Sequence, residues 1–224
     1  MLDLLRSSPL GFALLAAVLL MSLAFHELAH AFAADRMGDK TARHQGRLTL
    51  DPLKHLDPLG TLLIFFAGFG WARPVPIQPA NFRHYRVGMF VVAIAGVLVN
   101  ITIALLSLGV LSALGLRLGD VGLTVLPGSS ADTLSQSQVG SGVLSALLFA
   151  ARINILLTVF NLIPVPPLDG SKALGALLPK RLQTALWQLE RFGFLFVIII
   201  IVGFQAQVSQ LIDTVMSVLF RFIL

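Results

Sequence analysis

The run from Pro9 to Ala34 is almost entirely apolar, and the pattern His26-Glu27-Leu28-Ala29-His30 lies near its end. The run is long enough to cross a bilayer as a helix, which takes about 20 residues. Its ionisable residues are the two histidines and the glutamate between them. Because an ionisable side chain at membrane depth is costly, such residues are candidates for function. We therefore expect a membrane-spanning helix that carries a functional site.

Two histidines spaced four apart lie on one face of a helix, so His26 and His30 can both reach a single zinc ion. Glu27 is then placed to accept a proton from a zinc-bound water. The pattern is short and arises by chance in soluble helices, but chance placement in an uncharged span costs several kcal/mol, about 3 per charge. The sequence thus predicts a zinc hydrolase with Glu27 as the catalytic base.

The composition is that of a membrane protein. Of the 224 residues, 56% are hydrophobic and 12% are charged, against roughly 25% charged in soluble domains. The mean hydropathy of +0.87 suits about four to six membrane spans. The chain has no cysteine, so a metal must be held by His, Asp or Glu. The net charge of +5 comes from loops between apolar runs, which indicates contact with membrane lipids and no nucleic-acid partner.

We expect an all-α polytopic membrane protein formed by a single membrane-embedded domain over residues 1–224. A further apolar segment, Leu59–Gly70, is too short to cross a bilayer, and with its flanking prolines it predicts a short re-entrant or β-like insertion near 46–80. The stretch 205–224 either continues the last span, lies on the membrane surface or forms a short extra span. The expected spans cover about 9–34, 87–116, 142–162 and 192–212.

Basic residues predict the orientation. They concentrate in the segments 36–86 and 172–191, whereas the 117–141 loop has only Arg117. By the positive-inside rule, 35–87 and 164–191 are cytoplasmic, and the N-terminus and the 117–141 loop are outside. His26 and His30 then lie roughly 8–14 Å inside the cytoplasmic end of their helix.

Asp169 follows the third apolar run at a similar depth, after a proline-rich break. Taken alone, Leu168-Asp169-Gly170 is a good turn sequence. The shared depth with His26 and His30 instead favours Asp169 as the third protein ligand of a catalytic zinc, which keeps one position open for water.

Other polar residues have two interpretations each. Asn100, deep in the second span, either makes a helix–helix hydrogen bond or contacts the substrate carbonyl or the oxyanion during cleavage. Asn161 faces the same choice, and for Asn154 we favour the helix–helix bond. His44, His55 and His84 lie in a basic loop and are expected to be solvated or to face lipid headgroups, with His55 the one that can approach the site.

These motifs together resemble the site-2 protease family of intramembrane zinc metalloproteases, in a compact prokaryotic form without PDZ or CBS domains. Besides His26–His30, the resemblance rests on Gly46–Pro52, His55–Thr61, Gly70–Pro76 and Asn161–Gly170. It implies that Zn²⁺ binds His26, His30 and Asp169 and that Glu27 is the base. It also implies a multi-pass protein of the prokaryotic plasma membrane, with its active site toward the cytoplasm, that cleaves transmembrane or signal-anchor helices.

The resemblance also matches Asn100 to the asparagine of the family's G-P-x-x-N element. The chain departs from the family at Val97, where proline is usual, at Asp51, where asparagine is common, and at Ser171, where glycine is common. None of these departures removes a ligand or the base. The alternative is a non-catalytic zinc-binding membrane scaffold or a cation carrier, and Glu27 discriminates against both because neither needs a base beside the metal.

Overall fold

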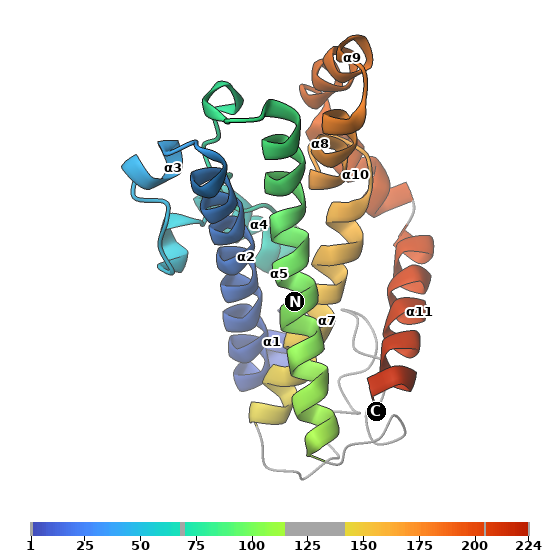
Figure 1. Cartoon of the computed structure of the whole chain (residues 1–224). Coiled ribbons are helices and arrows are strands. Elements are labelled where there is room, and N and C mark those ends of the chain that lie inside the picture. The colour runs from blue at the N-terminus through green and yellow to red at the C-terminus, as the bar shows by residue number, and fades with distance from the viewer. Residues whose placement is uncertain (1, 68–69, 115–141, 204, 224) are drawn as a thin grey trace.

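Three long helices dominate the computed structural model, which describes residues 2–67, 70–114, 142–203 and 205–223. They are α2 (Pro9–Met37), α5 (Tyr85–Ala113) and α7 (Gly142–Leu162), and each is long and apolar enough to cross a membrane. They pack side by side and alternate in direction, α2 and α7 upward and α5 downward in Figure 1. No strand occurs among the described residues. The all-α polytopic fold expected from the sequence is confirmed.

Helix α2 has clear start and stop signals. The Ser8 side chain accepts a hydrogen bond from the Gly11 N–H, and Pro9 occupies the first helical position, where its missing N–H costs nothing. The helix ends at Gly38, whose φ of 115° is the left-handed conformation that glycine adopts freely. A Cβ on Gly38 would also lie 3.0 Å from the Asn81 carbonyl oxygen. Helix α2 therefore extends three residues beyond the expected end at Ala34.

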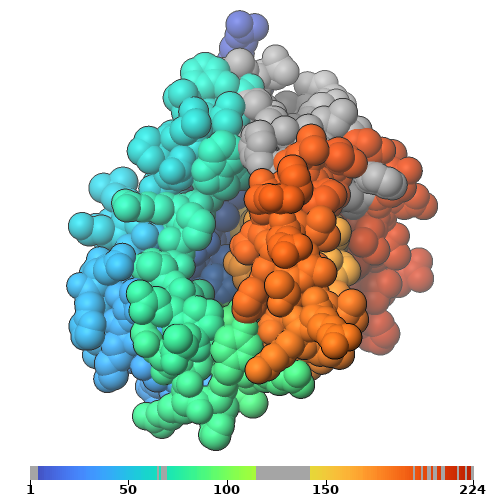
Figure 2. Space-filling model, turned by 90° about the horizontal axis from the view of Figure 1, so that it is seen from above, coloured from blue at the N-terminus to red at the C-terminus, as the bar shows by residue number. Residues whose placement is uncertain are grey.

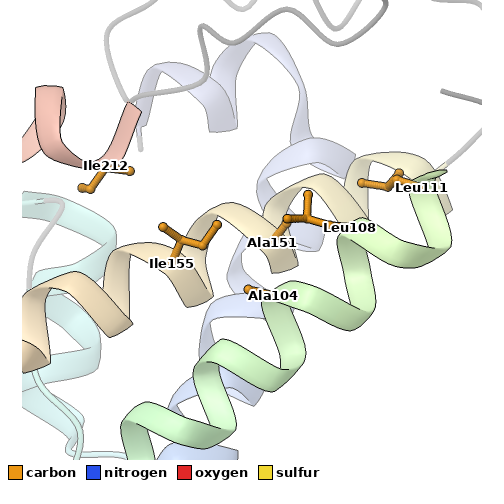
Figure 3. Close-up of a cluster of buried hydrophobic side chains, with 6 residues drawn as sticks. All are labelled: Ala104, Leu108, Leu111, Ala151, Ile155 and Ile212. Atoms are coloured by element: carbon orange, nitrogen blue, oxygen red, sulfur yellow. The ribbon is translucent and has the colours of Figure 1, made fainter. Parts of the chain in front are cut away.

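The main apolar core joins α5 to α7. Ala104, Leu108 and Leu111 of α5 pack against Ala151 and Ile155 of α7 (Figure 3). Ile212 adds a contact from α11 (Gln205–Ile223). The Arg152 guanidinium of α7 also forms an ion pair with Asp213 of α11, at 3.3 Å. Helix α11 is thus attached to the bundle by both apolar and charged contacts.

The helices α10 (Gly193–Gly203) and α11 correspond to the last apolar part of the chain. In Figure 1 they follow one another along the side of the bundle. Neither is among the three helices that qualify as spans by length and composition. The fourth span expected at 192–212 covers α10 and the first part of α11, and residue 204 between them lies outside the described residues, as does the expected outer loop 117–141.

The insertion near 46–80 is less β-like than the sequence suggests. Its short apolar segment forms helix α4 (Pro58–Ala67), and outside residues 68–69 its β structure is a single antiparallel bridge between Leu56 and Ala72. The chain then returns in extended form to the 3₁₀ turn η2 (Pro79–Asn81). Prolines remove the N–H groups that a ladder needs, so a sheet cannot continue through Pro74, Pro76 and Pro79.

The remaining short elements include α1 (Leu2–Ser7), which precedes α2. The others in the described part of the chain are α3 (Thr41–His44), the 3₁₀ turn η1 (Pro52–Lys54), α8 (Asp169–Leu177) and α9 (Lys180–Glu190). Helices α3, α8 and α9 lie at the same end of the bundle as the start of α5 (Figure 1). The two segments rich in basic residues therefore share one end of the molecule.

Candidate metal centre and active site

Three potential metal ligands converge inside the bundle. His26 and His30 lie one turn apart on α2, and Asp169 is the first residue of α8. The two histidine Nε2 atoms lie 3.0 Å apart, and they lie 3.1 and 3.0 Å from the same Asp169 oxygen, Oδ2. All three residues are buried, with at most 6% of their surface exposed. The structure thus brings together the three residues that the sequence singled out as ligands.

Asp169 reaches this position because the chain turns tightly after α7. Helix α7 ends at Leu162, and a proline-rich turn leads to α8. A Cβ on Gly170 would lie 2.4 Å from the Leu162 carbonyl oxygen, so no larger residue fits there. The second oxygen of Asp169, Oδ1, lies 3.4 Å from the Lys172 ammonium. Lys172 therefore holds one carboxylate oxygen while the other faces the two histidines.

A stripe of α5, made of Val92, Gly96 and Asn100, supports the histidines. Nδ1 of His30 lies 2.7 Å from the Val92 carbonyl oxygen, and Nδ1 of His26 lies 3.0 Å from the Asn100 side-chain amide. Between them, a Cβ on Gly96 would lie 2.5 Å from Cε1 of His26. Residues spaced by four share one helix face. In order along the helix, this face offers the two histidines the Val92 carbonyl as an acceptor, the space at Gly96 and the Asn100 amide.

The cluster fits a zinc ion. Because the Val92 carbonyl can only accept, Nδ1 of His30 carries the proton and Nε2 presents a lone pair. The Nε2 atoms of His26 and His30 and the Asp169 carboxylate oxygen face one another at 3.0–3.1 Å, and a cation bound among them would satisfy all three. A tetrahedral zinc ion with bonds of about 2.0–2.2 Å separates its ligand atoms by about 3.3–3.6 Å. The three atoms must move apart by only a few tenths of an ångström.

Asn100 fits the same scheme. Its buried side-chain oxygen has no hydrogen-bond partner in the placed orientation. Turning the amide by 180° exchanges oxygen and nitrogen without other change. The oxygen then accepts the proton of His26 Nδ1 and the amide nitrogen takes the position without a partner, which leaves His26 Nε2 free for a metal. This orientation of the Asn100 amide is the one compatible with a metal bound through Nε2 of both histidines.

Glu27 lies beside the cluster and is partly exposed, unlike the three candidate ligands. Its carboxylate oxygen Oε2 accepts a hydrogen bond of 3.1 Å from the backbone N–H of Val75. Val75 belongs to the extended segment that leads to η2. Figure 2 shows a hollow between the teal segment that precedes α5 and the orange α8 and α9, with the blue of α2 at its floor. This side of α2 is therefore open to the surface.

The other predicted site residues lie apart from the ligands. The Asn161 amide donates to the carbonyl of Leu157 in its own helix, at 3.0 Å. The His55 side chain is completely buried and its Nε2 lies 2.9 Å from the Thr49 carbonyl, so it is not solvated as expected and does not join the cluster. Asn154 contacts Ser22 of α2 at 2.9 Å, a helix–helix bond as expected.

Sequence reasoning overlooked Val92 and Gly96 as parts of the site. Their spacing of four with Asn100 along one helix was a detectable signal. It overlooked Val75 because a contact made by a backbone N–H leaves no trace in the residue type.

The sequence model of "Peptidase family M50" matches residues 14–204, which is most of the chain. The chain belongs to peptidase family M50. "Putative zinc metalloprotease YwhC" of Bacillus subtilis (strain 168) is 38% identical over 184 residues, which cover 82% of this chain and 78% of that protein. "Putative zinc metalloprotease Rip2" of Mycolicibacterium smegmatis is 31% identical over 196 residues, 85% of this chain and 67% of that protein. No solved structure matches the chain significantly.

The resemblance to the site-2 proteases is thereby confirmed, and this M50 peptidase is a zinc metalloprotease. Its three long apolar helices identify it as a membrane protein. The buried group of two histidines and one aspartate is compatible with the zinc that the family requires.

Proposed function

We propose that this M50 peptidase hydrolyses a peptide bond within or near a transmembrane helix of a membrane-protein substrate. The observation that carries the proposal is the burial of His26, His30 and Asp169 among helices that are apolar enough to cross a membrane. The two histidines lie in the second half of α2, so its earlier turns extend on one side of them. A substrate bond that reaches them must enter the apolar layer.

In the proposed reaction His26, His30 and Asp169 hold the metal and Glu27 is the general base. When bound, the zinc ion acidifies a water molecule and polarises the scissile carbonyl. Glu27 accepts a proton from that water as its oxygen attacks the carbonyl carbon. The carbon–nitrogen bond then breaks, and Glu27 returns the proton to the leaving amine. Asn100 and Val92 hold the two imidazoles so that Nε2 remains available.

The substrate helix must unwind before it is cut, because its carbonyls are engaged in hydrogen bonds that are hard to give up in lipid. We therefore expect helix-weakening residues near the cleavage point. Glycine and proline disfavour a helix by about 1 and 3 kcal/mol relative to alanine. Signal-anchor and transmembrane segments with such residues are the proposed substrate class.

The test uses a panel of model transmembrane helices incorporated in vesicles with the purified protein. The helices differ only in whether the central residues are leucine or include glycine and proline, and mass spectrometry locates the cut. We expect a cut inside the apolar segment, faster with glycine or proline, and none with the Glu27→Gln protein. Cleavage confined to the soluble flanks would contradict the proposal.

We further propose that the active-site end faces the cytoplasm of a prokaryotic cell. The segments 36–86 and 172–191, which carry most of the basic residues, lie at that end (Figure 1), and positive residues are retained on the cytoplasmic side. Because the chain has no cysteine, single cysteines can report on orientation. We expect Lys180→Cys to react with an impermeant thiol reagent only after the cells are permeabilised, and Ser7→Cys to react in intact cells.

A further inference from the structure

Arg47 is a buried charge that the proposed mechanism does not use. It follows α3, and only 6% of its surface is exposed. Its Nη2 donates to the carbonyl oxygens of Arg73, at 2.6 Å, and Pro74, at 3.2 Å. Its Nε is buried without a hydrogen-bond partner. Burying a guanidinium with an unsatisfied donor is costly, so packing alone does not explain an arginine at this position.

The carbonyl of Pro74 and the N–H of Val75 belong to the same peptide group. The carbonyl accepts from Arg47, and the N–H donates to Oε2 of Glu27. A peptide group is planar, so a bond that fixes its oxygen also fixes the direction of its N–H. Bonds to the two ends of one peptide group also polarise each other. Arg47 and Glu27 are therefore connected through one rigid unit.

The surrounding contacts leave this unit little freedom. Pro74 and Pro76 have no N–H, so Val75 carries the N–H donor between Arg73 and Ile77. The Arg73 N–H donates to the His55 carbonyl at 2.8 Å. The side chain of Val75 packs against Ala31, one turn beyond Glu27 on α2.

The pKa of Arg47 agrees with this connection. Burial lowers the pKa of the guanidinium and nearby Arg73 lowers it further, while the Glu27 carboxylate opposes both. An arginine keeps its charge throughout the physiological range, so the Arg47 charge is attracted to Glu27 as well as hydrogen-bonded to the segment.

We propose that Arg47 is a positioning residue, which orients the Glu27 carboxylate beside the metal ligands through the Pro74–Val75 peptide group. The inference rests on the proposed role of Glu27 as the base. Arg47 itself touches neither the ligands nor, in this scheme, the reacting atoms. Its loss leaves the metal ligands in place and misdirects the base.

The experiment compares Arg47→Met with three other variants in vesicles. Val75→Pro removes the N–H that reaches Glu27, whereas Val75→Ala keeps it and trims the side chain. Arg43→Met is the matched arginine control, because Arg43 pairs with Asp35 at the surface and does not contact the 73–75 segment. Turnover, KM, zinc content and thermal stability are measured for each.

We expect Arg47→Met and Val75→Pro each to lower kcat about 10- to 100-fold, since small misplacements of a reacting group have effects of this size. KM and zinc content should remain close to wild type, and so should the kcat of Arg43→Met. Val75→Ala, which keeps the N–H, should lose less kcat than Val75→Pro. Because both changes break the same connection between Arg47 and Glu27, the kcat of the Arg47→Met, Val75→Pro double variant should be no lower than that of the slower single variant. Wild-type kcat in Arg47→Met, or multiplicative losses in the double variant, would overturn the proposal.

A second readout needs no activity and works on the metal-free protein. In ¹⁵N-valine-labelled protein the Val75 amide is identified by its absence in Val75→Ala. The hydrogen bond to a carboxylate should protect it from exchange, and Arg47→Met should speed that exchange at least tenfold. Arg47→Lys, which keeps a charge and donors on a shorter side chain, should recover part of the protection. An unchanged exchange rate in Arg47→Met would overturn the connection.

The role of Glu27 as base and the role of Arg47 in positioning it are tested by different results. If Glu27→Gln retains turnover, the role of Glu27 as base is wrong, whatever the Val75 amide does. If Glu27→Gln is inactive while Arg47→Met keeps wild-type kcat and Val75 exchange, only the positioning role of Arg47 is wrong.

Discussion

Gly96 offers a sharp test of how the two histidines are held. A Cβ at this position would lie 2.5 Å from Cε1 of His26 and 2.6 Å from Nε2 of His30. Carbon and nitrogen atoms in contact are normally about 3.5 Å or more apart, so Gly96→Ala must displace both rings by roughly 1 Å. Metal–ligand distances tolerate changes of only about 0.2 Å. The variant is therefore expected to lose a large part of its zinc affinity.

The expected loss of zinc affinity is estimated from variants of residues that hold a metal ligand without binding the metal. Replacing a residue that only orients a ligand costs about 10- to 100-fold in metal affinity, and here the ligands themselves move. We expect a loss of at least about 100-fold, or about 2.7 kcal/mol, measured by competition with a chromogenic chelator. Gly109→Ala is the control, because it lies on the same helix with no atom within 4 Å of its Cβ. It should keep zinc affinity and match or exceed wild-type stability. Wild-type zinc affinity in Gly96→Ala would refute the packing argument.

Two further predictions concern side chains around the site. Asn100→Ala should weaken zinc binding about 10- to 100-fold by removing the partner of His26 Nδ1. Asn100→Asp, which keeps an acceptor at this position, should retain zinc binding. Unchanged zinc affinity with an altered KM in Asn100→Ala would instead indicate that Asn100 contacts the substrate. Asp39→Asn should destabilise the protein by about 1–3 kcal/mol, because the Asp39 carboxylate accepts from Thr41, Gln78 and Asn81 and joins the end of α2 to η2. Burial raises the pKa of Asp39, but these hydrogen bonds outweigh burial and the net shift is downward. Its stabilisation is thus present above about pH 4 and is lost as the pH falls through the lowered pKa, so the Tm difference between wild type and Asp39→Asn should close in acid.

The three candidate ligands could be predicted from the sequence because their placement depends on simple geometry. His26 and His30 share a helix face by spacing alone, and Asp169 was identified by its depth at the end of another span. The structure brings all three together. The partners of Asn100 could not be foreseen, because they depend on how far α5 is shifted along α2. That shift is set by the close approach at Gly96, which only the packed structure shows.

The insertion shows a different limit. Leu59–Gly70 was interpreted as re-entrant or β-like because of its length, glycines and flanking prolines. Most of it forms the short helix α4, so the β-like alternative is wrong. Its glycines serve a tertiary contact, since a Cβ on Gly60 would lie 2.2 Å from the Trp71 carbonyl oxygen. The burial of His55 likewise results from the way this segment folds back, through the bridge between Leu56 and Ala72. Local pattern cannot distinguish a glycine that breaks a helix from one that lets a second segment approach it.

The central claim is that one set of residues holds the metal and a different residue moves the proton. Its most direct test is the zinc content per chain, measured by elemental analysis beside cleavage activity in Glu27→Gln and Asp169→Ala. We predict that Glu27→Gln keeps one zinc ion and loses turnover by at least the roughly 10²–10⁴-fold typical of removing a general base. Asp169→Ala, left with two protein ligands, should lose both zinc and activity. Full zinc and full activity in Asp169→Ala, or wild-type turnover in Glu27→Gln, would contradict the account.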